Sequence, residues 1–210
     1  MSPKRKKSKK KAPRQLSRII LIAGLGSIVI GLLILISTFL PVISVEIRYT
    51  IMQRTPKHTS DSQKPVNAAF GIVIPKIGAN AVIIPNVDPY DSSIYQRALA
   101  KGIAHAKGSV FPGRVGNMFL FSHSSVNFYE ALRYNSVFYL LNKLETGDEI
   151  YIYMNSTKFI YRVIEKKLVE PNTTFYLTEK TSDKLVTLMT CWPPGTTFKR
   201  LIVRAILEQP

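Results

Sequence analysis

One long stretch without charge constrains this chain more than any other feature. From Ile19 to Val45 the sequence holds no Asp, Glu, Lys or Arg, and its most apolar part, Ile19–Leu40, has 22 residues. At about 1.5 Å rise per residue, a helix of that length matches the roughly 30 Å hydrocarbon core of a bilayer. A buried helix of a soluble domain usually keeps a polar face, and this stretch has none. We therefore predict an uncleaved transmembrane anchor over residues 19–45.

A cleaved signal peptide is the closest alternative, because basic residues precede the apolar stretch. However, the stretch exceeds the roughly 7–15 residues of a signal-peptide core, and no convincing A-x-A-like cleavage site follows it. Residues 1–18 carry nine basic side chains and no acidic one, whereas Glu46 and Arg48 flank the other end. Because positive charge stays on the cytoplasmic side, we predict a basic cytoplasmic tail over residues 1–18, in contact with anionic lipid. The rest of the chain would then lie outside the cell.

The formal net charge of +16 suggests a nucleic-acid partner until the charges are located. More than half of the excess lies in the tail, and residues 19–210 hold 20 basic against 13 acidic side chains. The charge therefore indicates orientation in a membrane, and no nucleic acid is expected as a partner. A single cysteine excludes an intramolecular disulfide and a multi-Cys metal site. Since carboxylates do not cluster either, no metal and no cofactor are predicted.

Residues 46–69 are predicted to form an extracellular stalk. They are mostly polar, contain Pro56 and Pro65 and show no sustained periodicity. The folded domain, residues 70–210, should begin near Phe70.

Short β-branched runs separated by turn signals predict that this domain is mostly β. Asp91 can cap a short helix through Ala100, and residues 128–144 are predicted to be partly helical. Seven or eight strands at short spacing favour a small barrel or a sandwich. The predicted strands lie within residues 71–77, 81–85, 116–123, 149–153, 158–169, 185–190 and 200–207.

The chemistry centres on Cys191, which ends the apolar run 185–190 and precedes a Trp-Pro-Pro-Gly turn. A lone cysteine is either a small buried hydrophobe or a reactive thiol, and a place at a strand end beside a rigid turn favours the thiol. A nucleophilic thiolate needs a basic or cationic group nearby. His123 also ends a predicted strand, and Arg200, nine residues after Cys191, can face it across a strand–turn–strand hairpin.

Each partner of the thiol has a rival. His105 is the other histidine of the domain, but it follows a predicted helix rather than a buried strand, so His123 is preferred. Arg204 shares a face with Arg200 in strand alternation, but it lies further from the Cys191 edge.

The residues around the cysteine match a known family. Thr187-Leu188-Met189-Thr190-Cys191, followed by Arg200, resembles the T-L-x-T-C … R signature of sortases. Four upstream blocks agree in the right order, and the resemblance covers about residues 70–208. The first block, residues 74–78, resembles the opening strand of the family, and the second, residues 98–105, resembles its A-L-x-x-G-x-x-H block. The third block, residues 116–123, resembles G-N-x-x-x-x-x-H, and the fourth, residues 144–148, resembles L-x-x-G-D.

The resemblance implies a cysteine transpeptidase on an eight-stranded β-barrel with short helices, behind an N-terminal transmembrane helix. Cys191 would attack the carbonyl of a Leu-Pro-x-Thr-Gly-like sorting signal and form a thioester, and His123 would move the protons. Arg200 would bind the substrate and stabilise the oxyanion, and Thr190 is a further candidate contact to substrate or oxyanion. The implied partners are surface-protein or pilin substrates and an amine that accepts the acyl group. The class within the family stays open.

Two other functions are considered. An L,D-transpeptidase also uses Cys, His and Arg on a β-rich fold, but its S-x-G-C-x-R signature is absent around Cys191. The other is a non-catalytic, membrane-tethered binding domain in which the cysteine is merely buried.

Overall fold

A computed structural model describes residues 14–54, 64–124 and 137–208 of the chain. The chain divides into two compact units, Met1–Ser44 and Val45–Pro210. The described part of the first unit is helical, and the second unit carries all of the described strands.

The N-terminal helix α1 (Arg14–Arg54) contains the uncharged stretch. Its segment Arg18–Ser37 has a mean hydropathy of 3.0, and every side chain in it is exposed. By length and composition this segment can cross a membrane, and it fits a single-pass anchor. The helix also continues beyond the predicted span, so residues 46–54 are helical where an irregular stalk was expected. No Gly or Pro interrupts the chain there until Pro56.

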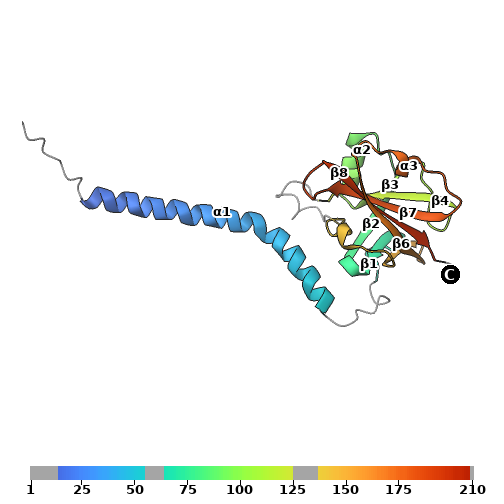
Figure 1. The fold of residues 1–210 in the computed structure, drawn as a ribbon, viewed down its shortest axis with the longest axis horizontal. Helices are drawn as coiled ribbons and strands as arrows, with labels where there is room; N and C mark the ends of the chain where they lie inside the picture. The colour runs from blue at the N-terminus through green and yellow to red at the C-terminus, as the bar shows by residue number, and fades with distance from the viewer. Residues whose placement is uncertain (1–13, 55–63, 125–136, 209–210) are drawn as a thin grey trace, which may run out of the picture. The chain divides into compact units, whose positions relative to one another are not determined.

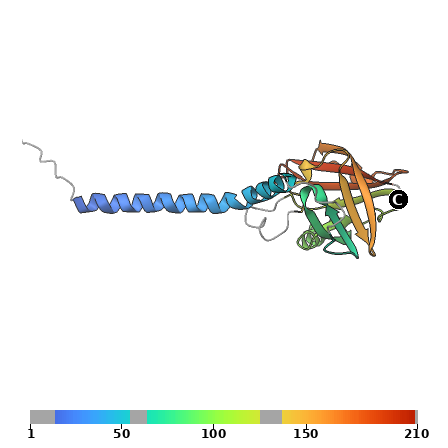
Figure 2. The same ribbon diagram turned by 90° about the horizontal axis from the view of Figure 1, so that it is seen from below.

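The second unit is a closed barrel of eight strands in the order β1-β2-β3-β4-β7-β8-β6-β5 (Figures 1 and 2). The barrel closes because β1 pairs with both β2 and β5, which leaves no free sheet edge. The strands are β1 (Phe70–Ile74), β2 (Ala79–Val87), β3 (Ile103–Ala106), β4 (Gly116–Phe121), β5 (Glu149–Met154), β6 (Thr157–Val169), β7 (Lys184–Trp192) and β8 (Lys199–Leu207). The short helices are η1 (Pro75–Ile77), α2 (Ser92–Leu99), η2 (Leu141–Lys143) and α3 (Phe175–Thr178).

The barrel confirms the predicted mainly-β fold and decides against the sandwich. Helix α2 also begins as expected, because Asp91 Oδ1 accepts hydrogen bonds from the backbone N–H groups of Ser93 and Ile94 at 2.9 and 3.2 Å. The sequence prediction missed β3 and α3. Of the predicted helical region 128–144, residues 128–136 lie outside the described residues, and the rest holds turns and η2.

Apolar side chains on the two faces of the barrel wall form two separate layers. Alternate residues of the strands fill the inside, which we call the inner core, and the intervening residues of β2, β3, β4, β7 and β8 pack with α2 and α3 outside, which we call the outer apolar cluster. The inner core includes Ile72, Ile83, Met118, Leu120, Ile152, Val186, Leu188, Leu201 and Val203. The outer apolar cluster includes Leu99, Ala104, Phe119, Phe121, Tyr176 and Ile202, with Met189, Val169 and Leu177 packed against them.

Gly102 lies where the chain passes from α2 into β3. A Cβ atom at this position would lie 2.4 Å from the Val82 carbonyl oxygen of the neighbouring strand β2. That distance is far inside van der Waals contact, and a backbone oxygen within a ladder cannot easily move away. The close approach explains a glycine here, within the 98–105 block.

We expect Gly102→Ala to lower the free energy of unfolding by about 1–3 kcal/mol, since overpacking at a rigid backbone contact forces the strands apart. The measurement is urea unfolding of the full chain in detergent, followed by tryptophan fluorescence. Lys101→Ala, at the exposed neighbouring position, is the matched control and should stay within about 0.5 kcal/mol of the wild type. Equal stability of the Gly102→Ala variant and the wild type would contradict the steric explanation.

Candidate active site

Cys191 and Arg200 face each other across the β7–β8 hairpin. Cys191 is the second-last residue of β7, and its Cα partner in the antiparallel ladder is Arg200, the second residue of β8. Side chains of directly opposed antiparallel residues leave the same face of the sheet, with Cβ atoms about 4.5–5.5 Å apart. Both residues are half-buried. The predicted hairpin therefore brings the thiol and the guanidinium group to one edge of the sheet.

Strand β4, on the other side of β7, leads His123 toward the same edge. The two strands run parallel in unbroken register through Phe121. They stay joined one residue further, because Thr190 Oγ1 donates a hydrogen bond to the Ser122 carbonyl oxygen at 2.9 Å. Extending the same register by one more residue would place His123, which follows the end of β4, level with Cys191. We call His123, Cys191 and Arg200 the His–Cys–Arg row.

This row lies on the outer face of the barrel wall. In β4, β7 and β8 the residues of opposite parity, such as Leu120, Leu188 and Leu201, point into the inner core. One step along the outer face lies a second row, which consists of Phe121, Met189 and Ile202 and belongs to the outer apolar cluster. We call it the apolar row. Phe121 and Ile202 of the apolar row are buried. The His–Cys–Arg row thus lies next to a packed apolar layer of the outer face.

The two arginines of β8 have different surroundings. Arg200 Nη1 donates to the carbonyl oxygens of Thr197 and Lys199, both at 3.2 Å, and makes no ion pair with a carboxylate in the described part of the chain. Arg204, in contrast, is paired with Glu165 and Glu179. Arg200 is therefore the arginine of β8 without a carboxylate partner among the described residues, and its predicted catalytic role stays a prediction.

Thr190 is buried, with 2% of its surface exposed. Its hydroxyl donates to the Ser122 carbonyl oxygen, so it ties β7 to β4 immediately before His123. These contacts support a role in holding the two strand ends together. The predicted contact of Thr190 with substrate or oxyanion stays a prediction.

The rival histidine faces the opposite way. His105 lies in β3, not directly after a helix as predicted, and is fully buried. Its ring stacks on Phe111 with centroids 4.7 Å apart. The Asn86 N–H donates to Nδ1 at 3.3 Å, which assigns the proton to Nε2 for donation to the Val110 carbonyl oxygen at 3.1 Å. Burial lowers the pKa of His105 below its ordinary value of 6.5, although the hydrogen bond to Val110 raises it in part. His105 is thus a neutral residue inside the barrel wall.

Several structural features around the His–Cys–Arg row have no recognisable local pattern in the sequence. Ser122, whose carbonyl joins β4 to β7, has no distinctive sequence context. The β6–β7 loop (residues 170–183) contains α3, for which no prediction was made from the sequence. The apolar row could have been found from strand alternation, because its members lie two residues before or after those of the His–Cys–Arg row. Among the described residues, no group of three His, Cys, Asp or Glu side chains is arranged to hold a metal ion.

A closed eight-stranded barrel with a thiol, an imidazole and a guanidinium group at adjacent strand ends defines a candidate cysteine acyltransferase. The comparisons with known proteins agree. The family model of the sortase domain matches residues 72–208. Sortase D from Bacillus subtilis (strain 168) is 28% identical over 151 residues, which cover 70% of this chain and 68% of that protein.

Solved structures give the same result. Sortase A from Corynebacterium diphtheriae, a lid mutant, aligns with a TM-score of 0.56 at 26% identity, over 72% of this chain and 75% of that one. A sortase D5 transpeptidase from Clostridium perfringens aligns with a TM-score of 0.55 at 26% identity, over 79% and 94%. The chain belongs to the sortase family, whose members are cysteine transpeptidases. The family therefore decides in favour of the enzyme and against an L,D-transpeptidase or a non-catalytic domain.

The buried, neutral His105 should make stability depend on pH. Below pH 6.5 the unfolded chain takes up a proton at His105 that the folded barrel resists, so the free energy of unfolding falls as the pH falls. This contribution is at most about 1.4 kcal/mol per pH unit. We expect wild type to lose more stability than His105→Gln between pH 7.5 and pH 5.5, as measured by urea unfolding. Parallel losses in the two proteins would show that His105 does not titrate in this way.

Proposed function

We propose that Cys191, His123 and Arg200 are the catalytic residues of this sortase and that they cleave and transfer a Leu-Pro-x-Thr-Gly-like sorting signal. The observation that carries the proposal is the strand register, which aligns Cys191 directly with Arg200 and leads His123 to the same outer edge. Each of the three groups is able to supply one part of an acyl transfer, and His123 comes from a part of the sequence distant from the Cys191–Arg200 hairpin.

In the first half of the reaction, the Cys191 thiolate attacks the carbonyl carbon of the Thr–Gly bond. The carbon–nitrogen bond breaks, a thioester forms, and the leaving amine takes a proton from His123. In the second half, an acceptor amine gives a proton to His123 and attacks the thioester, which regenerates the thiolate. The covalent intermediate divides one difficult acyl transfer into two easier ones, and imidazole is suited to proton transfer near neutral pH.

Arg200 would stabilise the negative oxygen that develops in both tetrahedral intermediates. A guanidinium group stays charged at every relevant pH and donates in a fixed geometry. The absence of an ion-pairing carboxylate among the described residues supports this assignment, since Arg200 can turn its remaining donors toward a substrate.

The proposed substrates are surface proteins or pilins with a C-terminal sorting motif, and the acceptor is an amine of the cell envelope or of a pilin. Residues 1–18 would form a cytoplasmic tail, residues 19–45 the anchor and residues 46–69 the extracellular connection to the catalytic domain, residues 70–210. Nine basic residues before the apolar segment support this orientation. The apolar segment lies within one continuous helix, α1, which supports its role as the anchor.

The catalytic roles predict a graded set of activities toward a fluorogenic Leu-Pro-x-Thr-Gly peptide, measured with the full chain in detergent. Cys191→Ala should abolish both cleavage of the peptide and formation of the thioester intermediate, which mass spectrometry detects. His123→Ala should lower kcat/KM by roughly 10²–10⁴-fold, and Arg200→Met by roughly 10²–10³-fold.

Arg97→Ala, at an exposed position of α2, is the control for loss of an arginine and should keep wild-type activity. His105→Gln should keep any activity that its stability permits. Unchanged turnover in His123→Ala would overturn the assignment of the proton-transfer group.

The orientation can be tested with a cysteine label, because the chain holds a single cysteine. In a Cys191→Ala background, Lys101→Cys places a thiol at an exposed position of the barrel unit. We expect a membrane-impermeant maleimide to label it in intact cells from which the wall has been removed. Labelling that requires lysis of the cells would contradict an extracellular catalytic domain.

A further inference from the structure

The β6–β7 loop starts beside the His–Cys–Arg row. It leaves β6 at Val169, whose Cα partner on β8 is Arg200. Its first residue, Glu170, lies within ion-pair distance of Lys199, at 3.9 Å. The loop ends at Asp183, whose carbonyl oxygen accepts a hydrogen bond from the Gly116 N–H at 2.8 Å. It therefore runs along the outer face from the cysteine edge to the start of β4.

The short helix in this loop covers part of the outer apolar cluster. Tyr176 and Leu177 of α3 pack in that cluster, which also contains the apolar row. The loop thus helps to bury the outer apolar cluster next to the edge that carries Cys191.

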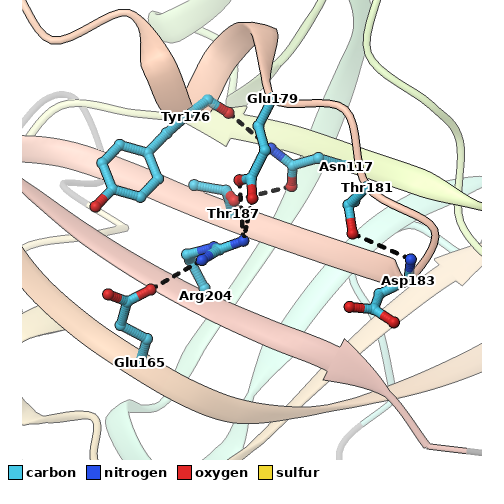
Figure 3. Close-up of polar contacts among 8 residues, drawn as sticks. All are labelled: Asn117, Glu165, Tyr176, Glu179, Thr181, Asp183, Thr187 and Arg204. Atoms are coloured by element: carbon cyan, nitrogen blue, oxygen red, sulfur yellow. Dashed lines mark hydrogen bonds and ion pairs between the residues drawn. The ribbon is translucent and has the colours of Figure 1, made fainter.

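Arg204 fixes the loop from strand β8. It lies on the same face as Arg200, and its Nη2 donates to both carboxylate oxygens of Glu179 in the loop, at 2.7 and 2.9 Å (Figure 3). Its Nη1 donates to Glu165 of β6 at 3.0 Å. The side chains of Arg204 and Glu179 are only 16% and 15% exposed, so water screens this pair weakly. The guanidinium carbon also lies 5.8 Å from the centroid of the Tyr176 ring.

Asn117 fixes the loop from strand β4. Its Nδ2 donates to the Tyr176 carbonyl oxygen at 2.7 Å, and its Oδ1 accepts from Thr187 Oγ1 at 2.8 Å. Figure 3 shows these contacts beside those of Arg204. Asn117 and Thr187 are both buried. Because the amide is held on both sides, it presents its N–H group to the loop in one fixed orientation.

We propose that Arg204 and Asn117 are positioning residues that clamp the β6–β7 loop as a fixed wall of the peptide site, and that they set the affinity for the substrate peptide. This inference rests on the proposed function of the His–Cys–Arg row. If the competent loop position is populated only in part, the apparent affinity falls by that fraction. The chemistry at Cys191 is not touched, because neither residue belongs to the His–Cys–Arg row.

Arg204 binds two carboxylates, and substituting them one at a time distinguishes a role in holding the loop from a role in stabilising the barrel. Glu179 belongs to the loop, whereas Glu165 lies in β6 and is the Cα partner of Arg204 in the β6–β8 ladder. Glu179→Gln therefore weakens the clamp, and Glu165→Gln removes a similar charge from the same guanidinium group without releasing the loop.

The experiment measures KM and kcat of the full chain in detergent with a Leu-Pro-x-Thr-Gly peptide. We expect Glu179→Gln to raise KM about tenfold while kcat stays within about twofold, because the loop loses charge-assisted hydrogen bonds to Arg204. Glu165→Gln should leave KM within about twofold of wild type. Asn117→Ala should raise KM in the same way as Glu179→Gln. Equal effects of Glu179→Gln and Glu165→Gln on KM, or a loss in kcat alone, would overturn the proposal.

Hydrogen exchange provides a readout that does not depend on activity. Exchange in residues 170–183 should rise at least severalfold in Glu179→Gln but not in Glu165→Gln, and the rate of alkylation of Cys191 by iodoacetamide should be the same in both. Unchanged exchange in Glu179→Gln would show that Arg204 does not hold the loop. A wild-type chain that fails to cleave the peptide would refute the proposed function, while the exchange data would still decide whether the clamp exists.

Discussion

The site depends on one constraint, which is the register of β7 between β4 and β8. Side chains alternate along a strand, so a slip of one residue moves every side chain to the other face. Such a slip in β7 would turn Cys191 inward and expose Val186 and Leu188, which are fully buried in the inner core. The apolar packing that stabilises the barrel therefore also holds the thiol on the outer face. The stability of the barrel and the geometry of the proposed catalytic residues are set by the same side-chain alternation.

The barrel wall gives two histidines opposite characters. His105 has an aromatic neighbour, two hydrogen-bonded ring nitrogens and no exposed surface, and burial keeps it neutral. His123 follows an outward position of β4 and is half-buried. A proton-transfer group must reach both the substrate and the thiol, and His105, with no exposed surface, cannot do so. The face of the sheet, rather than the residue type, distinguishes the two.

The parts that could be predicted from sequence are those with local signals. Long β-branched runs predicted most strands, and the nine-residue spacing from Cys191 to Arg200 predicted their alignment because a single hairpin joins them. Strand β3 was missed because Ile103–Ala106 is short and alanine-rich and follows α2 after a brief turn. The alignment of His123 with Cys191 depends on a parallel pairing of strands far apart in sequence, for which only family resemblance provided a guide. The contacts of Asn117 with Tyr176 and of Arg204 with Glu179 are also long-range, and no local pattern encodes them.

The spacing of residues within β4 and β8 links the site to the clamp. Asn117 and His123 are six residues apart and Arg200 and Arg204 are four apart, and both separations are even. Even separations along a strand keep side chains on one face, so each of these strands can hold the β6–β7 loop and supply a group to the His–Cys–Arg row at once. A movement of either strand would then shift the loop and the reacting groups together. The buried Asn117 at the start of β4 and the proposed proton-transfer residue His123, just beyond its end, thus lie in the same sequence block, residues 116–123.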